Sequence, residues 1–161
     1  MQLWHTFKLS LKIPSKRAVF QLNRIGMDIV VFYLFVLLAI VSIPPLIDLL
    51  TTTSGFEGKL NIVFKFIYFF IFSYLPLTII IFLLLSLIAY VGKGIAHLLK
   101  RKLIFSLLWK MVAFTTTIPF LLYAIFSSFY RTDTQWLMLF IPYSLFLLVK
   151  IILIYPKRKR G

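Results

Sequence analysis

Four long apolar runs dominate the chain, and short polar segments separate them. The runs cover residues 28–50, 62–91, 103–130 and 136–155. A helix rises about 1.5 Å per residue, so each run is long enough to cross a hydrocarbon core of about 30 Å. The pattern therefore predicts an all-α polytopic membrane protein, with four transmembrane helices in one domain over residues 27–155.

The first 26 residues have a different pattern, typical of an amphipathic helix. Trp4, Phe7 and Leu11 recur on one face, and Lys8 and Lys12 lie on a parallel polar face. Such a helix lies in the membrane interface, with its apolar side in the acyl boundary and its polar side at the phosphates. We expect residues 1–26 to form a cytoplasmic interfacial segment; the alternative is a plain cytoplasmic tail.

The basic residues predict the orientation of the chain in the membrane. The chain has 18 Lys and Arg against 4 Asp and Glu, a formal net charge of +14. All the Lys and Arg except Lys59, Lys65 and Arg131 fall on one side of the four-span scheme. Short loops rich in Lys and Arg stay in the cytoplasm. Both termini are therefore expected inside the cell, with residues 156–161 as a basic cytoplasmic tail.

The basic clusters also supply the candidate contact sites. Because the charge is divided among three short segments beside the membrane, we expect anionic lipids of the inner leaflet as the partner, and no nucleic acid. The alternative is that these charges only set the topology. The candidate contacts with lipid or a partner protein are Trp4, Lys8, Lys12, Lys16, Arg17, Lys100, Arg101, Lys102, Lys157, Arg158, Lys159 and Arg160.

The composition argues against a separate soluble domain and against enzyme chemistry. The chain is 61% hydrophobic, 18% aromatic and contains no cysteine. Histidine is the usual proton carrier at neutral pH, and the two histidines, His5 and His97, both lie beside the expected cytoplasmic charges. Paired carboxylates, metal-ligand spacings and phosphate-binding glycine loops are absent from the sequence. We therefore predict no catalytic site, no metal site and no cofactor.

Prolines interrupt each of the four predicted helices. Broken helices line binding sites in many transporters, which supports a small transporter or channel formed by oligomerisation as the alternative function. Transmembrane helices also tolerate proline, so the kinks can serve only to shape the bundle. The predicted kinks lie at Pro44, Pro45, Pro76, Pro119 and Pro142.

Several short motifs resemble one family of bacterial membrane proteins. The segment F-x-x-S-L-x-x-P begins at Phe7, and R-I-G at residues 24–26 leads directly into the first span. The basic K-R-K at residues 100–102 and T-I-P at residues 117–119 complete the pattern. The layout is similar to a functionally uncharacterised family of multi-pass proteins, some described as maltodextrin-utilisation proteins and related to the Yip superfamily. Members carry a sizeable insert after the first span, which the short segment 51–61 replaces here.

The resemblance implies an accessory or organising role in a bacterial cytoplasmic membrane, and it supplies no catalytic residues. Together with the charge pattern, it predicts a non-enzymatic regulatory subunit. Such a subunit acts through contacts with anionic lipids and with another membrane protein or complex. The sequence leaves open whether copies of the chain also associate with one another.

Overall fold

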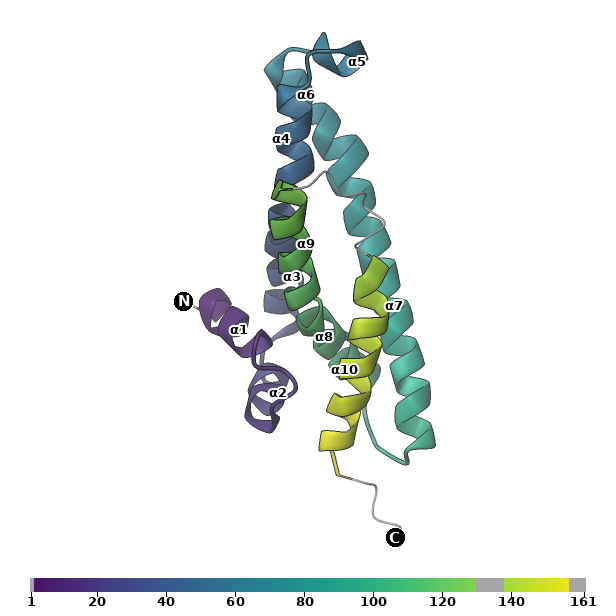
Figure 1. Cartoon of the computed structure of the whole chain (residues 1–161). Helices are drawn as coiled ribbons and strands as arrows, with labels where there is room; N and C mark the ends of the chain where they lie inside the picture. The colour runs from purple at the N-terminus through teal and green to yellow at the C-terminus, as the bar shows by residue number, and fades with distance from the viewer. Residues whose placement is uncertain (1, 130–137, 157–161) are drawn as a thin grey trace.

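Three long apolar helices form the body of the computed structural model, which describes residues 2–129 and 138–156 (Figure 1). They run over Met27–Thr51, Ile62–Leu98 and Phe105–Phe129, and each is long and apolar enough to cross a membrane. A shorter apolar helix, α10 (Phe140–Ile154), packs against two of them. Every regular element in the described part is helical, as expected of a helical membrane protein.

The first long helix is built from two pieces. Helix α3 (Met27–Val41) ends at Ser42, and α4 (Ile43–Thr51) begins at the next residue. Pro44 and Pro45 lie in the first turn of α4. Proline lacks the backbone N–H that an inner helical position needs, but the first turn of a helix has no use for that donor. The double proline therefore divides the span where the sequence predicts a bend.

The second long helix crosses its proline without a break. Helix α6 (Ile62–Phe69) continues through the π-helical segment η1 (Phe70–Tyr74) into α7 (Leu75–Leu98). At the end of η1 the Leu75 N–H bonds to the Phe70 carbonyl, five residues earlier. A π-helical turn is wider than an α-helical turn, and it accommodates the missing N–H of Pro76 without ending the helix.

Two features of the helices differ from the predicted pattern. The helix that contains the second predicted span continues past residue 91 to Leu98, and at Gly92 it packs closely against the Leu148 side chain of α10. Pro142 does not interrupt α10, because it lies in the first turn of that helix. The predicted start of the fourth run at residue 136 lies outside the described residues.

The third long helix supplies the centre of the bundle. It consists of α8 (Phe105–Thr115) and α9 (Thr117–Phe129), which meet at Thr116, just before Pro119. Helix α8 packs against α3, α7 and α10. Its large side chains, including Met111 and Phe114, are fully buried. The core therefore surrounds α8, and the other apolar helices turn much of their remaining surface outward.

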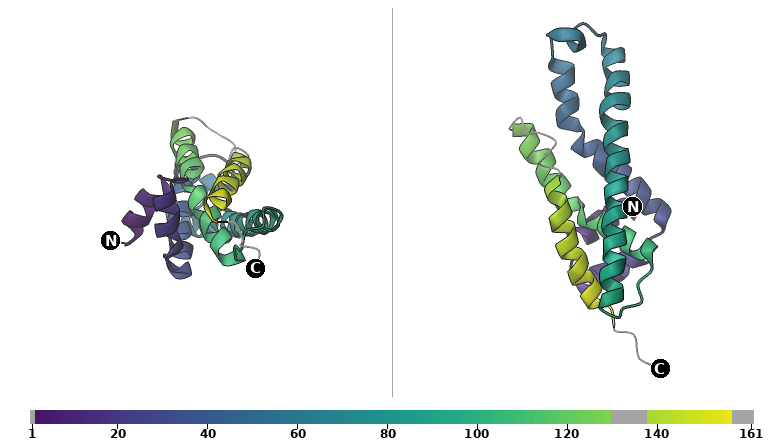
Figure 2. Two further views of the ribbon diagram at one scale, coloured as in Figure 1. Left: turned by 90° about the horizontal axis from the view of Figure 1, so that it is seen from below. Right: turned by 90° about the vertical axis from the view of Figure 1, so that its right-hand side faces the viewer.

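A hairpin made by α4, the short helix α5 (Gly55–Gly58) and α6 extends past the outer ends of α9 and α10 (Figure 2). Within it Lys65 is 7% exposed. Its Nζ donates to the carbonyls of Leu49 at 3.1 Å, Leu50 at 3.3 Å and Thr52 at 2.8 Å. These carbonyls lie at the C-terminal end of α4, where helix carbonyls lack donors and the helix dipole is negative. Lys65 thus ties the two arms of the hairpin together.

Candidate functional site

The candidate site is the N-terminal platform, which we define as residues 2–26. It contains α1 (Gln2–Ser10) and α2 (Lys16–Asn23), which pack against each other at the side of the bundle (Figure 1). Ser15 caps α2 by accepting a bond from the Ala18 N–H at 3.4 Å. Helix α2 also packs on the central helix α8. The platform is therefore a folded part of the protein and not a free tail.

The inner side of the platform is apolar with two hydroxyl groups. Its buried apolar residues belong to the same hydrophobic core as the long apolar helices, and Thr6 and Ser10 are buried beside them. The buried residues of the platform are Thr6, Leu9, Ser10, Ile13, Ala18, Val19 and Leu22.

The outer side of the platform carries aromatic and cationic groups. Trp4 is 62% exposed and stacks on Phe7, with ring centroids 5.6 Å apart. The Lys8 Nζ lies 5.1 Å from the Trp4 ring centroid, within cation–π range. Leu11 and Phe20 are exposed large apolar residues. This pairing of apolar rings with ammonium groups is typical of a surface that lies at a lipid headgroup boundary.

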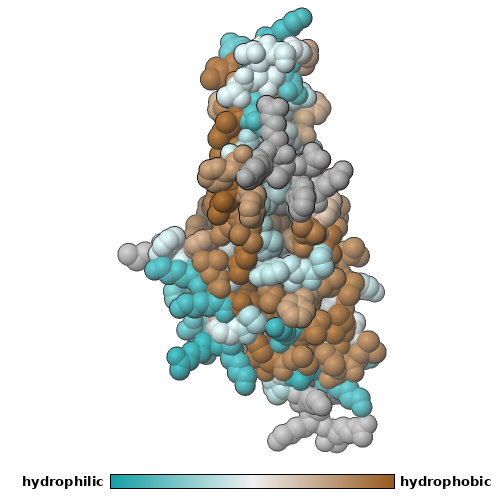
Figure 3. Space-filling model, in the orientation of Figure 1, coloured by the Kyte–Doolittle hydropathy of each residue, from teal (hydrophilic) through white to brown (hydrophobic). Residues whose placement is uncertain are grey.

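The predicted basic contacts of the platform lie on this outer side. Lys12, Lys16 and Arg17 are all exposed. In the space-filling view hydrophilic side chains gather over α1 and α2, beside the apolar band of the bundle (Figure 3). Positive charge and exposed apolar groups thus share one surface.

Lys110 attaches the platform to the centre of the bundle. Its side chain leaves α8, and its Nζ donates to the carbonyls of Asn23 at 2.8 Å and Ile25 at 3.0 Å. These carbonyls lie at the C-terminal end of α2, where they lack helical donors. A cation at this end also interacts favourably with the helix dipole.

A chain of three buried hydroxyl groups forms a second attachment. The Tyr33 hydroxyl on α3 lies 3.1 Å from Ser10 Oγ on α1 and 2.8 Å from Thr117 Oγ1 on α9. Ser10 also contacts the Phe7 carbonyl, and Thr117 contacts the Phe114 carbonyl. Three hydroxyl hydrogens serve these four contacts, so only three can be hydrogen bonds at one time. The chain therefore has alternative donor arrangements.

The chain of hydroxyls ends at the break between α8 and α9. There the hydroxyls of Thr115, Thr116 and Thr117 donate to carbonyls three residues earlier, at 2.7, 2.7 and 2.9 Å. Pro119 has no N–H, so the Thr115 carbonyl lacks its helical donor. The three hydroxyls bond to the carbonyls of the turn just before that position. The platform is thus linked by polar contacts to the most irregular point of the third long helix.

The other predicted contact residues do not join the platform. Lys100, Arg101 and Lys102 follow α7, at the same end of the bundle but on another side (Figure 2). Lys100 has a left-handed backbone with φ 55°, Arg101 is half-buried and Lys102 is exposed. The predicted contacts Lys157, Arg158, Lys159 and Arg160 lie outside the described residues.

The described residues contain no group of three or more His, Cys, Asp or Glu side chains that could hold a metal ion. Sequence reasoning did not find the roles of Ser10, Tyr33, Lys110 and Thr117. The only sign of these roles in the sequence is that Lys110 and Tyr33 lie inside apolar runs. Their positions do not identify the groups to which they bond.

No protein-family model, curated protein or solved structure matches the chain. The resemblance to a bacterial family related to the Yip superfamily therefore stays a prediction.

Proposed function

We propose that this protein is a non-enzymatic accessory subunit of a bacterial cytoplasmic membrane, which contacts anionic lipids and another membrane protein. The observation that carries the proposal is the N-terminal platform. It presents Trp4, Lys8, Lys12, Lys16 and Arg17 on its outer side, while Lys110 and Tyr33 fix its inner side to the bundle. A fixed cationic surface suits contact with phosphates, because each Lys or Arg near an anionic leaflet contributes about 1 kcal/mol.

The proposal includes four spans with both termini in the cytoplasm. Helix α10 is 15 residues long, or about 22 Å at the helical rise, and the fourth span proposed from the sequence begins before it, at residue 136. Because the chain has no cysteine, single introduced cysteines can report sidedness. A cysteine in place of Gly55 should react with a membrane-impermeant maleimide from outside intact cells, and one at Lys102 only after lysis. The reverse result at both sites would refute the orientation.

Lipid contact is tested by the depth of the platform in the membrane. A spin label on Leu11→Cys is placed at an exposed apolar position directly after the end of α1. We expect collisions with oxygen to exceed collisions with a water-soluble nickel complex in vesicles of phosphatidylglycerol. This preference should weaken in phosphatidylcholine vesicles and in a Lys12→Gln/Lys16→Gln variant. The same water exposure in both lipids would refute the lipid role.

Partner contact is tested by crosslinking and purification from native membranes. A partner recovered near one-to-one, and lost in the Lys12→Gln/Lys16→Gln variant, would support the accessory role. The matched control is Lys93→Gln/Lys150→Gln, which removes the same charge from exposed positions outside the platform. Recovery of only this chain from cells would refute an accessory role with a stable partner.

Transport is the alternative that the same purified protein can test. The space between the helices is filled by fully buried side chains such as Leu34, Leu85, Leu108 and Leu148. Among the described residues, the core of a single copy is therefore packed with apolar side chains. Flux would need several copies. Saturable, solute-specific flux in reconstituted vesicles would replace the accessory proposal with transport.

A further inference from the structure

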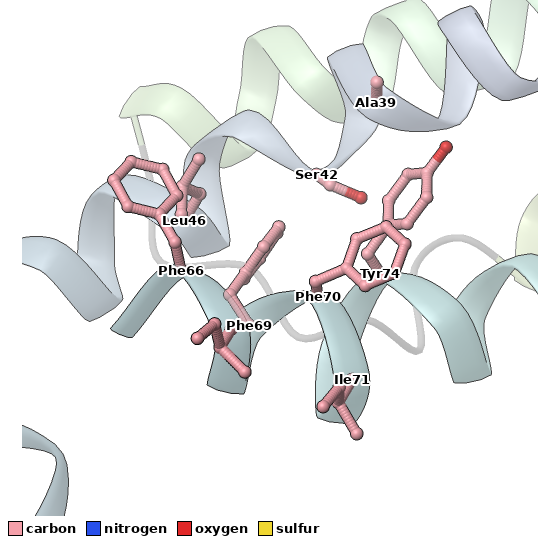
Figure 4. A pocket seen from close by; sticks show the side chains of 9 residues that line it. Ala39, Ser42, Leu46, Phe66, Phe69, Phe70, Ile71 and Tyr74 are labelled. Carbon is pink, nitrogen blue, oxygen red and sulfur yellow. The ribbon is translucent and has the colours of Figure 1, made fainter. Parts of the chain in front are cut away.

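A groove opens between the first long helix and the second, in the outer part of the molecule (Figure 4). Its volume is about 650 Å³. Ala39, Ser42 and Leu46 line it from α3 and α4, and Phe66, Phe70 and Tyr74 line it from α6 and η1. We name it the aromatic groove. It lies between two of the helices that are long and apolar enough to span a membrane, so in a membrane it would face hydrocarbon.

One polar group in the aromatic groove has no partner among the described residues. Ser42 is 3% exposed, and its hydroxyl makes no hydrogen bond. Figure 4 shows the oxygen directed across the groove toward the rings of Phe70 and Tyr74. Most buried polar groups are hydrogen-bonded, so an unpaired hydroxyl in an apolar setting calls for an explanation.

The backbone beside Ser42 is also short of donors. Pro45 has no N–H to offer to the carbonyl of Val41, one turn earlier. The opposite wall of the groove is the π-helical segment η1, and such segments occur frequently at functional sites. Two irregular helix segments therefore face each other across the groove, and Ser42 lies between them.

We propose that the aromatic groove binds a membrane-dissolved amphiphile, with an apolar body and one hydroxyl or carbonyl that bonds to the Ser42 hydroxyl once this buried side chain turns into the groove. The volume falls within the range of about 300–1,000 Å³ that small-molecule sites occupy, and the lining is the usual one of apolar and aromatic groups with few polar atoms. The site is independent of the N-terminal platform, so either proposal can fail without the other.

The depth of Ser42 argues for this ligand over an ordinary phospholipid chain. Ser42 precedes Thr51, where α4 ends, by a stretch of helix that measures roughly 14 Å at 1.5 Å per residue. Acyl chains carry no hydrogen-bonding group so far below the headgroups. A partner helix, about 10–12 Å across with its side chains, is also too wide to enter a space of this volume and would lie over it.

The test is photolabelling of the full chain in vesicles of phosphatidylcholine and phosphatidylglycerol. The probe is a long-chain primary alcohol with a diazirine on its chain, and the matched probe is the same chain without the hydroxyl. We expect the alcohol to label residues 39–46 and 66–74, and excess plain alcohol to suppress that labelling. Ser42→Ala should lower the labelling about fivefold, the effect of losing one neutral hydrogen bond.

A second variant separates occupancy of the groove from effects on folding. Ala39→Phe places a ring in the groove and should abolish labelling by both probes, whereas Leu87→Phe adds a ring at an exposed position on α7 and should leave it unchanged. Equal labelling by the two probes, unaffected by Ser42→Ala, would mean that the groove holds lipid without selection. That outcome would overturn the proposal even if Ala39→Phe fails to fold.

Discussion

The contact between Lys110 and the end of α2 provides a test of how the N-terminal platform is held. Replacing Lys110 with Met keeps the length and apolar stem of the side chain but removes its ammonium group. The carbonyls of Asn23 and Ile25 then lose donors at 2.8 and 3.0 Å. We expect α2 to open locally more often, while the rest of the bundle stays folded.

The size of the effect follows from the two bonds. A hydrogen bond to a charged group contributes about 1.5–3 kcal/mol, and both bonds are lost together. Lys110 is only half-buried, so water replaces part of the loss, and the net cost is about 2 kcal/mol. Because 1.36 kcal/mol corresponds to a factor of ten, the opening constant should rise about 30-fold.

The assay is hydrogen exchange of the amides of α2, Lys16–Asn23, measured by mass spectrometry in a bilayer mimic. Exchange through local opening reports the opening constant directly. The control is Lys93→Met, which removes an exposed ammonium from α7. Exchange in α2 that is equally fast in Lys110→Met and Lys93→Met would refute the tether. Faster exchange throughout the bundle would show that Lys110 stabilises the whole fold and not the platform.

Three further contacts are tested by substitution. Tyr33→Phe removes both contacts of the phenol hydroxyl and should lower the free energy of unfolding by about 1 kcal/mol. Hydrogen exchange of the α1 amides should become faster, and unchanged exchange would refute the hydroxyl link. Lys65→Met should lower the free energy of unfolding, measured by thermal unfolding, by about 3 kcal/mol, because three carbonyls lose a charged donor. Lys59 is exposed, so Lys59→Met should change that free energy by no more than about 0.5 kcal/mol. Gly92→Ala should cost about 1–3 kcal/mol, since its new methyl meets a leucine of α10. Gly94→Ala has open space and should stabilise α7 by about 0.5–1 kcal/mol, and equal effects of the two glycine variants would contradict the packing.

Hydropathy alone was sufficient to find the long helices. The predicted run 28–50 corresponds to Met27–Thr51, and the run 103–130 corresponds to Phe105–Phe129. A membrane requires about 20 apolar residues per span and backbone groups that are satisfied within the helix, so length and polarity decide the element. Local chemistry also located the breaks beside Pro44, Pro45 and Pro119, because a missing N–H acts on its own helix.

Other features depend on a neighbour that is distant in the sequence. Gly92 lies where α10 approaches the helix closely, and a side chain there would meet Leu148. The pattern of charges predicted a surface at Trp4 and Lys8, which are exposed, but it said nothing about what holds that surface in place.

The sequence by itself determined which segments are apolar helices and where their charges lie, because these properties belong to each segment alone. Only the tertiary structure decided that Lys65 and Lys110 bind the ends of other helices and that Tyr33 joins α1 to α9. In a chain this apolar, one helix surface resembles another, and hydrophobicity does not select partners between them. The few polar side chains find their bonds only once close packing has fixed which helix ends face them.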